Sequence, residues 1–201
     1  YGPKYGIKLF KLILNTYLSE YSIFVSELAK NRENRIFLNS DEEHGLIVYV
    51  NLLKSAKKQI RIFAGRLCEH IGNKPEFVEA ISDFIERGGT VSILLNNYDE
   101  NIIVKSPLFM RLAYYVSEKK NISVKATEVT AHLGNNGQVH FAIADDTAYR
   151  LETDVVERTA QCNFNNATIA AKLIEVFDKV FDSKEYSHEI NLMHLFAYDI
   201  K

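Results

Sequence analysis

The sequence has little cysteine, and this scarcity excludes two kinds of protein. Cys68 and Cys162 are its only cysteines. Two thiols are too few for the disulfide framework of a small secreted domain, and they lack the spacing of metal ligands. We therefore expect both to be small buried residues, and not reactive groups, in a reducing compartment. This predicts a cytoplasmic protein.

An excess of positive charge is also missing. The chain of 201 residues carries 24 lysines and arginines against 26 aspartates and glutamates, a formal net charge of −2. Without a global basic field, binding to nucleic acid would require a local patch. The nearest group of cations is Lys57, Lys58, Arg61 and Arg66. These residues could touch phosphates, but we expect them to form a solvated helix end and strand edge.

No apolar run is long enough to cross a membrane. The nearest candidate is the segment 5–25, which Lys8, Lys11 and Glu20 interrupt, and it lacks the small-residue cleavage site of a signal peptide. We therefore expect no membrane span. Because the first residue is Tyr1 and not Met, we expect a longer chain, with a further domain or a protein partner at this end.

Motifs of several enzyme classes are absent as well. There is no Gly-rich phosphate loop, since Gly88-Gly89 ends a predicted helix and does not open one, and there is no HExxH or CxxC motif. No serine lies in the context of a nucleophile elbow. His132 and His140 flank the loop 133–138 and could approach each other, but no third ligand has a useful spacing. We therefore predict neither a metal nor a cofactor.

The sequence does contain a long apolar periodicity near its N-terminus. The apolar residues recur at helical spacing and predict a helix over 7–30, which ends at the charged run "KNRENR"; they are Leu9, Ile13, Leu14, Tyr17, Leu18, Tyr21, Phe24, Val25 and Leu28. Its apolar stripe should pack on this domain or on a missing neighbour. Ser40 and Glu43 have the spacing of a capping box and predict the start of a second helix. The predicted buried face of that helix contains Leu46, Ile47, Val50 and Leu53.

From Gln59 onward the chain alternates between strands and helices. Predicted strands at 59–65, 90–96 and 122–128 are separated by predicted helices that open at Pro75 and Pro107. This order predicts an α/β fold, with a mixed, mostly parallel sheet and helices on both faces. The predicted divisions are an N-terminal helical segment (1–35), the α/β domain (36–182) and a C-terminal tail (183–201).

The stretch "GNNGQVHFAIADDTAYRLETD", residues 134–154, predicts a β-hairpin. On its first arm Val139, Phe141 and Ile143 point to one face, and His140 points to the other. Asp145-Asp146 is typical of a tight turn, after which the chain returns antiparallel.

This hairpin predicts a polar cluster around His140. A two-residue turn would pair residue 140 with 151, which makes Arg150 and Glu152 diagonal neighbours of His140, although strict pairing could put them on the opposite face. Asn163 and Asn165 could add hydrogen bonds from a further predicted strand. Two interpretations follow: the side chains satisfy one another as a structural cluster, or they bind a ligand, since an Arg beside a His can bind phosphate.

The order of elements over about residues 40–182 resembles one half of a phospholipase D-like fold. The strand-helix-strand unit at 56–96 is similar to the opening of that fold, and "AAKLIEVFDKVF" at 170–181 is similar to its closing helix. The family carries the motif HxKxxxxD on a strand-turn hairpin, followed by a Gly-Ser pair and an Asn on the return strand.

The resemblance implies a single degenerate copy of this motif. With the turns aligned, the family's histidine falls on Gln138, its lysine on His140 and its aspartate on Asp145. The Gly-Ser pair then falls on Glu152 and Thr153, and the asparagine on Val155.

The other register retains no more of the motif. With His140 aligned to the family's histidine, the lysine position holds Ala142 and the aspartate position holds Thr147. In the family, one histidine attacks phosphorus, a second protonates the leaving group, and lysines neutralise the phosphate. The two histidines come from two motif copies, in one chain or in a dimer. The resemblance therefore implies a homodimer that lacks the lysine, and we do not expect the family's catalysis.

We expect a catalytically degenerate phospholipase D-like domain that acts as a binding, sensing or assembly module. A protein partner, a phosphate-bearing ligand or nucleic acid would engage the face shared by the two copies. The candidate ligand-binding residues are Arg150, Glu152, Asn163, Asn165 and Asp145.

Two alternatives stay open. The first is a phosphodiesterase or nuclease in which His140 attacks and Arg150 replaces the lysine. The second is a structural accessory domain whose N-terminal helix docks on a larger assembly. An exposed apolar stripe on residues 9–28 would indicate the second.

Overall fold

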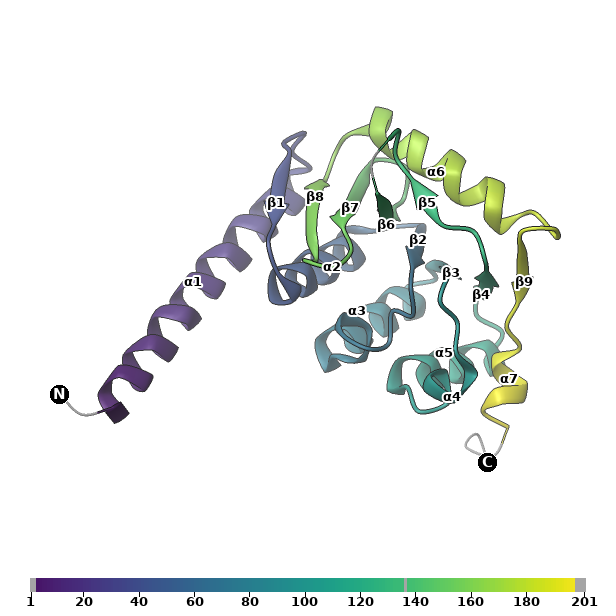
Figure 1. Cartoon of the computed structure of the whole chain (residues 1–201), viewed down its shortest axis with the longest axis horizontal. Coiled ribbons are helices and arrows are strands. Elements are labelled where there is room, and N and C mark those ends of the chain that lie inside the picture. The colour runs from purple at the N-terminus through teal and green to yellow at the C-terminus, as the bar shows by residue number, and fades with distance from the viewer. Residues whose placement is uncertain (1–2, 136, 198–201) are drawn as a thin grey trace.

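The computed structural model describes residues 3–135 and 137–197, which build one mixed sheet with helices packed around it (Figure 1). The helices are α1 (Pro3–Asn31), α2 (Glu42–Ser55), the 3-10 helix η1 (Ile71–Asn73), α3 (Pro75–Glu86), α4 (Glu100–Ile103), α5 (Pro107–Ser117), α6 (Ala167–Phe181) and α7 (Leu192–Leu195). The strands are β1 (Phe37–Asn39), β2 (Gln59–Ala64), β3 (Thr90–Leu95), β4 (Ile122–Thr127), β5 (Ala131–His132), β6 (Gln138–Ala144), β7 (Ala148–Asp154), β8 (Thr159–Asn163) and β9 (Ser187–Glu189).

The strands lie in the order β1-β8-β7-β6-β2-β3-β4-β9, and β5 pairs with β6 beside this path. The predicted α/β fold with a mixed sheet is confirmed. The expectation that parallel pairing would dominate is wrong. Within the described residues β2 pairs with β3 and β3 with β4 in parallel, and the other pairs are antiparallel. Parallel neighbours need a crossover, and helical crossovers join β2 to β3 and β3 to β4, whereas β5, β6, β7 and β8 follow one another through short connections.

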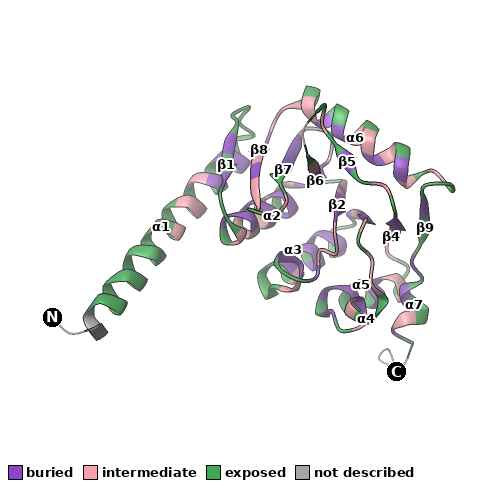
Figure 2. Ribbon diagram, in the orientation of Figure 1, coloured by how far each residue is buried: buried purple, intermediate pink, exposed green. Residues whose placement is uncertain are grey.

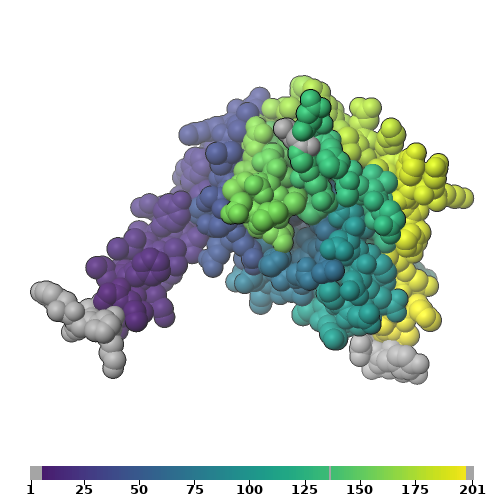
Figure 3. Space-filling model, viewed as in Figure 1, coloured from purple at the N-terminus to yellow at the C-terminus, as the bar shows by residue number. Residues whose placement is uncertain are grey.

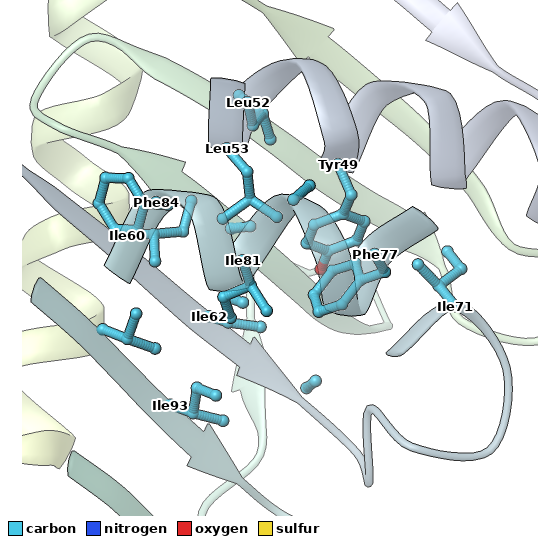
Figure 4. Packing of buried hydrophobic residues seen from close by; sticks show 14 of the residues in the cluster. Tyr49, Leu52, Leu53, Ile60, Ile62, Ile71, Phe77, Ile81, Phe84 and Ile93 are labelled. Atoms are coloured by element: carbon cyan, nitrogen blue, oxygen red, sulfur yellow. The ribbon is translucent and has the colours of Figure 1, made fainter. Parts of the chain in front are cut away.

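Helices cover both faces of the sheet, as predicted. On one face α6 buries Leu173 and Phe177 against β6 and β7. On the other face α2 and α3 pack over β2 and β3. Figure 4 shows this packing, with side chains from the two helices above Ile60, Ile62 and Ile93. A strand covered on both sides has no solvent face, and this explains why β3 is a nearly continuous apolar run.

Helix α2 begins one residue later than the capping-box pattern predicts. Its N-cap is Asp41, whose side chain accepts the backbone N–H of His44, so the prediction of Ser40 as the cap is wrong. The Oγ of Ser40 instead lies 3.2 Å from Nδ1 of His44. The buried face is also rotated from the predicted one: Val48, Tyr49, Leu52 and Leu53 are buried, whereas Leu46, Ile47 and Val50 are half-buried.

Helix α1 confirms the predicted long N-terminal helix but only its second half touches the domain. Val25, Leu28 and Ala29 are buried in the main core, and Tyr21 and Phe24 pack at its edge. The earlier turns project away from the rest of the molecule (Figure 1) and are exposed (Figure 2). Within the part of the chain that the structure describes, no helix has the length and apolarity needed to cross a bilayer.

The C-terminal segment, which carries no clear pattern in the sequence, belongs to the sheet and the core. Strand β9 pairs antiparallel with β4, at the edge opposite β1. Beyond it, Ile190, Leu192 and Phe196 are buried. Strand β9 and helix α7 are each so short that the periodicity of the sequence does not reveal them.

The two cysteines are buried and unpaired, as predicted. Burial raises the pKa of both thiols, and that of Cys162 rises to about 12. Such thiols stay protonated at neutral pH and behave as small apolar groups.

The turn of the β6-β7 hairpin contains three residues, so the predicted two-residue turn is wrong. Ala144 pairs with Ala148, and Asp145 adopts a left-handed backbone conformation (φ 54°). The Asp145 carboxylate accepts the backbone N–H groups of Lys57, Lys58 and Gln59. This one side chain therefore fixes the turn to the start of β2 and favours the longer turn.

We predict that Asp145→Ala lowers the free energy of unfolding by about 2 kcal/mol, because it removes the acceptor for these N–H groups and leaves a less suitable residue in the left-handed region. Asp145→Asn should cost about half as much, since it keeps one acceptor oxygen and tolerates that conformation. Urea titration measures both.

The matched control is Asp146→Ala in the same turn. Asp146 is exposed, so its replacement should change stability by less than about 0.5 kcal/mol. Equal losses at the two positions would show that the contacts of Asp145 do not fix the turn.

Candidate functional site

His140 and Glu152 lie directly opposite each other on β6 and β7, and Arg150 is opposite Ala142 on the same face. The three-residue turn produces this register, so the two residues are direct partners and not the predicted diagonal neighbours. Nδ1 of His140 is 3.6 Å from Oε1 of Glu152. Nη2 of Arg150 is 2.9 Å from Oε2 of the same carboxylate. The sheet therefore brings the three side chains together.

Arg150 is buried, with an exposed fraction of 1%. Besides Glu152 it binds Oδ1 of Asn39 through Nε, at 2.9 Å, and its guanidinium lies over the Tyr49 ring, 5.3 Å from the centroid. Gly45 of α2 allows this packing, because a Cβ there would lie 3.3 Å from Nη2 of Arg150. The arginine is thus enclosed by β1, β7 and α2.

Glu152 is a buried carboxylate surrounded by cations. Its exposed fraction is 3%, and Nη1 of Arg158 lies 3.7 Å from Oε1. Burial alone would raise its pKa, but the contacts with His140 and Arg150 outweigh burial and hold the pKa below its ordinary value of 4.5. The carboxylate is therefore ionised at neutral pH. Its Oε1 has no hydrogen-bond partner among the described residues.

Asn39 connects two of these cations. Its side-chain oxygen accepts from Arg150, and its Nδ2 donates to the backbone carbonyl of Arg158 at 3.1 Å. Sequence patterns predicted neither Asn39 nor Arg158 as part of the site. Strand β1 is too short to be recognised, and Arg158 lies in the turn before β8, so only the pairing of β1 with β8 brings them here.

A cleft with a volume of about 170 Å³ opens over this cluster. Its lining residues are Tyr49, Ala64, Gly65, Arg66, Leu67, Glu69, His70, Ile71, Asn97, His140, Arg150, Glu152, Val155 and Arg158. Several of them follow the carboxyl ends of the parallel strands β2 and β3, where open α/β sheets commonly bind ligands.

The opposite wall of the cleft carries a second histidine and a second cation. Arg66 binds Glu69 at 2.8 Å, and its Nε donates to the carbonyl of Asn97. Nδ1 of His70 lies 3.1 Å from Oε2 of Glu42. Within the described residues no group of three or more His, Cys, Asp or Glu side chains is arranged to hold a metal ion.

Three of the predicted ligand residues lie away from this cleft. Asn163 is opposite Tyr149 on the other face of the sheet, and its Nδ2 donates to Oδ1 of Asn34 at 2.9 Å. The backbone N–H of Asn165 donates to Oδ1 of Asn163. Asp145 is at the far end of the hairpin. The structure therefore gathers only His140, Arg150 and Glu152 from the predicted set.

The predicted basic group of residues is dispersed. Arg61 binds Asp178 of α6 at 3.1 Å, and Arg66 lies in the cleft. Lys57 lines a separate hollow of about 360 Å³ near the hairpin turn, together with Lys30, Arg32 and Lys54. That hollow contains no histidine among its lining residues.

We predict that Arg150→Met destabilises the protein by about 3–5 kcal/mol, because it leaves the charge of Glu152 buried without its closest partner. The double variant Arg150→Met/Glu152→Gln should be more stable than Arg150→Met alone, since it also removes the orphaned charge. Urea denaturation at neutral pH measures both. A double variant no more stable than the single one would contradict this account of the pair.

A pH titration of stability tests the lowered pKa of Glu152. Folding lowers the pKa of this carboxyl below its ordinary value of 4.5, so the ionised group stabilises the folded state when the pH is above 4.5. That contribution is lost as the pH falls through the lowered pKa. The difference in unfolding free energy between the native chain and Glu152→Gln should therefore be constant near neutrality and shrink below about pH 4. A difference that grows on acidification would overturn the assignment.

No protein-family model matches this chain, and neither does any curated protein sequence. Solved structures do match it. Nuc, a phospholipase D family member from Salmonella typhimurium, shares 15% identity at a TM-score of 0.53, over 79% of this chain and 99% of that one. NucT from Helicobacter pylori shares 15% identity at a TM-score of 0.52, over the same shares of the two chains.

A third similar structure is TrmBL2, an archaeal chromatin protein described as showing a novel mode of DNA binding. It shares 14% identity at a TM-score of 0.55, over 93% of this chain and 67% of that one. Likeness at such identities shows the fold alone. With strands, helices and cleft arranged as described, the chain has a phospholipase D-like fold.

Proposed function

We propose that this chain is a catalytically degenerate phospholipase D-like domain that binds a small phosphate-bearing ligand in the His140 cleft and acts as a binding, sensing or assembly module. The observation that carries the proposal is the buried Glu152 carboxylate beside His140. It occupies the position where the resemblance places the Gly of the family's Gly-Ser pair. In the same register His140 stands at the family's lysine position, so a carboxylate is paired with the side chain that would have to neutralise the phosphate during catalysis.

The state of Arg150 also supports this proposal. In the family a lysine neutralises the phosphate oxygens, and Arg150 is the residue that could replace it. Its guanidinium is buried and already engaged by Glu152, Asn39 and Tyr49. To bind a phosphate it would have to give up these contacts and leave Glu152 uncompensated, which costs several kcal/mol.

The cleft walls indicate what kind of ligand fits. Arg158 and Arg66 are partly exposed cations at its edges, suited to a phosphate group. The partly exposed carboxylate of Glu69 also lines the cleft and is suited to a hydroxyl donor on the ligand. The volume of about 170 Å³ is smaller than the sites of drug-sized molecules, so the ligand is small.

Titration with inorganic phosphate and with glycerol phosphate tests the proposal. NMR should show saturable shifts of the His140 ring signals, with tighter binding of glycerol phosphate because it adds hydroxyl donors. Arg158→Ala should weaken binding by about 10-fold or more, the loss expected for a hydrogen bond to a charged group. Arg35→Ala is the matched control, since Arg35 is exposed and lies outside the cleft. Binding that Arg158→Ala leaves unchanged would refute the site.

The alternative is a phosphodiesterase or nuclease that uses His140. One observation favours it: the imidazole lines the cleft and directs one nitrogen toward a carboxylate, an arrangement that orients catalytic histidines. Hydrolysis of a chromogenic phosphodiester and of single- and double-stranded nucleic acids tests it. Activity that disappears in His140→Ala would establish the enzyme, and no activity in either protein would support the binding module.

The predicted homodimer belongs to this proposal as well. In the family two motif copies meet at one face, and the same arrangement here would join two His140 clefts. Two copies facing each other would close the open side of the cleft over a bound ligand.

A further inference from the structure

The projecting half of α1 exposes an unusual amount of apolar surface. Seven large apolar side chains there are between 43% and 66% exposed: Ile7, Leu9, Phe10, Leu12, Ile13, Leu14 and Tyr17. They lie on one continuous helix that stands clear of the domain (Figures 1 and 3). Contiguous apolar patches of this size are rare on monomeric proteins and mark a surface that another molecule covers.

Part of this surface follows a heptad spacing. The stripe at 7, 10, 14 and 17 continues through Tyr21, Phe24 and Leu28, always in steps of three or four residues. The last three of these pack on the domain. Of the first four, Ile7, Phe10 and Leu14 are 43–66% exposed, and Tyr17 is 54% exposed although its ring lies 5.4 Å from that of His44. Alternating steps of three and four keep one seam of a helix facing a partner helix. The stripe therefore has the geometry for pairing with another helix.

We propose that this stripe (Ile7, Phe10, Leu14 and Tyr17) binds the same stripe of a second copy, so that two α1 helices form a short two-helix coil. A seam with this spacing requires a partner with the same spacing, and within the described chain only α1 leaves one uncovered. The proposal does not depend on the ligand cleft. It joins the two copies through α1, and not through the face at which the family's two motif copies meet.

The amount of surface suits a weak, reversible dimer. Large apolar side chains bury roughly 150–250 Å² each, so at the observed exposures the four stripe residues would remove roughly 330–550 Å² from each copy. The total of roughly 660–1,100 Å² lies in the range of weak or transient interfaces. The entropic cost is reduced because the helix is already formed, anchored by Val25 and Leu28 in the domain core.

Charge on α1 does not oppose this pairing. Lys8, Asn15, Ser19 and Ser22 follow helical spacing along one side, away from the stripe, and Lys11 borders the stripe at its edge. The stripe itself carries no charge, so two copies can meet without burying one. The same polar side would face water in the dimer.

Mass measurement of the whole chain by light scattering during size-exclusion chromatography tests the proposal. The native protein should have twice its chain mass of 23.0 kDa. Phe10→Glu/Leu14→Glu should weaken the dimer by at least about 100-fold, since pairing would bury charges. The matched control is Lys8→Glu/Ser19→Glu, which adds two glutamates to the polar side of the same helix and should leave the dimer intact. Circular dichroism checks that α1 stays helical in both.

The outcomes separate this proposal from the cleft proposal. Arg158→Ala should remain dimeric even where it abolishes phosphate binding. A native protein that is monomeric at all concentrations overturns the pairing of α1. So does a dimer that Phe10→Glu/Leu14→Glu leaves intact, because the copies must then meet elsewhere, as at the cleft face. A monomeric chain that co-sediments with anionic phospholipid vesicles would indicate that lipid covers the stripe, and this would also overturn the pairing of α1.

Discussion

The ionised carboxylate of Glu152 is the constraint on which the organisation of this domain depends. An ion removed from water must be compensated by fixed charges and hydrogen bonds, or it will not stay ionised. Here the compensation comes from β6, β7 and the turn before β8, through His140, Arg150 and Arg158. Arg150 in turn is held by β1 and α2. One buried charge thus ties together segments that are far apart along the chain.

This compensation also limits what the cleft can do. A catalytic cation has to be free to stabilise the negative charge that develops on the substrate. Arg150 is not free, because its guanidinium already binds the Glu152 carboxylate. In the proposed function the cleft would hold a phosphate group at its edge, while Arg150 serves the structure. The partly exposed cations, Arg66 and Arg158, stand at the edge of the cleft, which in the proposed function suits holding a ligand better than activating it.

The sequence was sufficient to predict the fold class but only part of the site. Long helices and the strands β2, β3, β4, β6 and β7 carry strong periodicity, so their existence could be predicted. Strands β1, β5 and β9 are too short for that signal. The polar cluster of His140, Arg150 and Glu152 was anticipated because the three residues lie on adjacent predicted strands, but the predicted two-residue turn could have put Arg150 and Glu152 on the opposite face. Asn39 and Arg158 were missed because only the pairing of distant strands places them there.

The predicted pairing of β6 with β7 was wrong by one residue, for a specific physical reason. A two-residue turn is the usual interpretation of consecutive aspartates between two strands. Asp145 instead accepts N–H groups from residues 57–59, a contact between segments that no local pattern reveals. The error at the cap of α2 is local instead: Asp41, the residue after the expected Ser40, accepts the backbone N–H of His44.

The three-residue turn has a consequence for how this protein can change over evolution. Side chains alternate between the faces of a strand, so one residue gained or lost in the turn would carry Arg150 and Glu152 to the opposite face of the sheet, against α6. Substitutions at the exposed turn position are tolerable, but changes of length are not. The turn between β6 and β7 is remote from the cleft, yet its length is constrained, because an insertion or deletion there would remove Arg150 and Glu152 from the cleft.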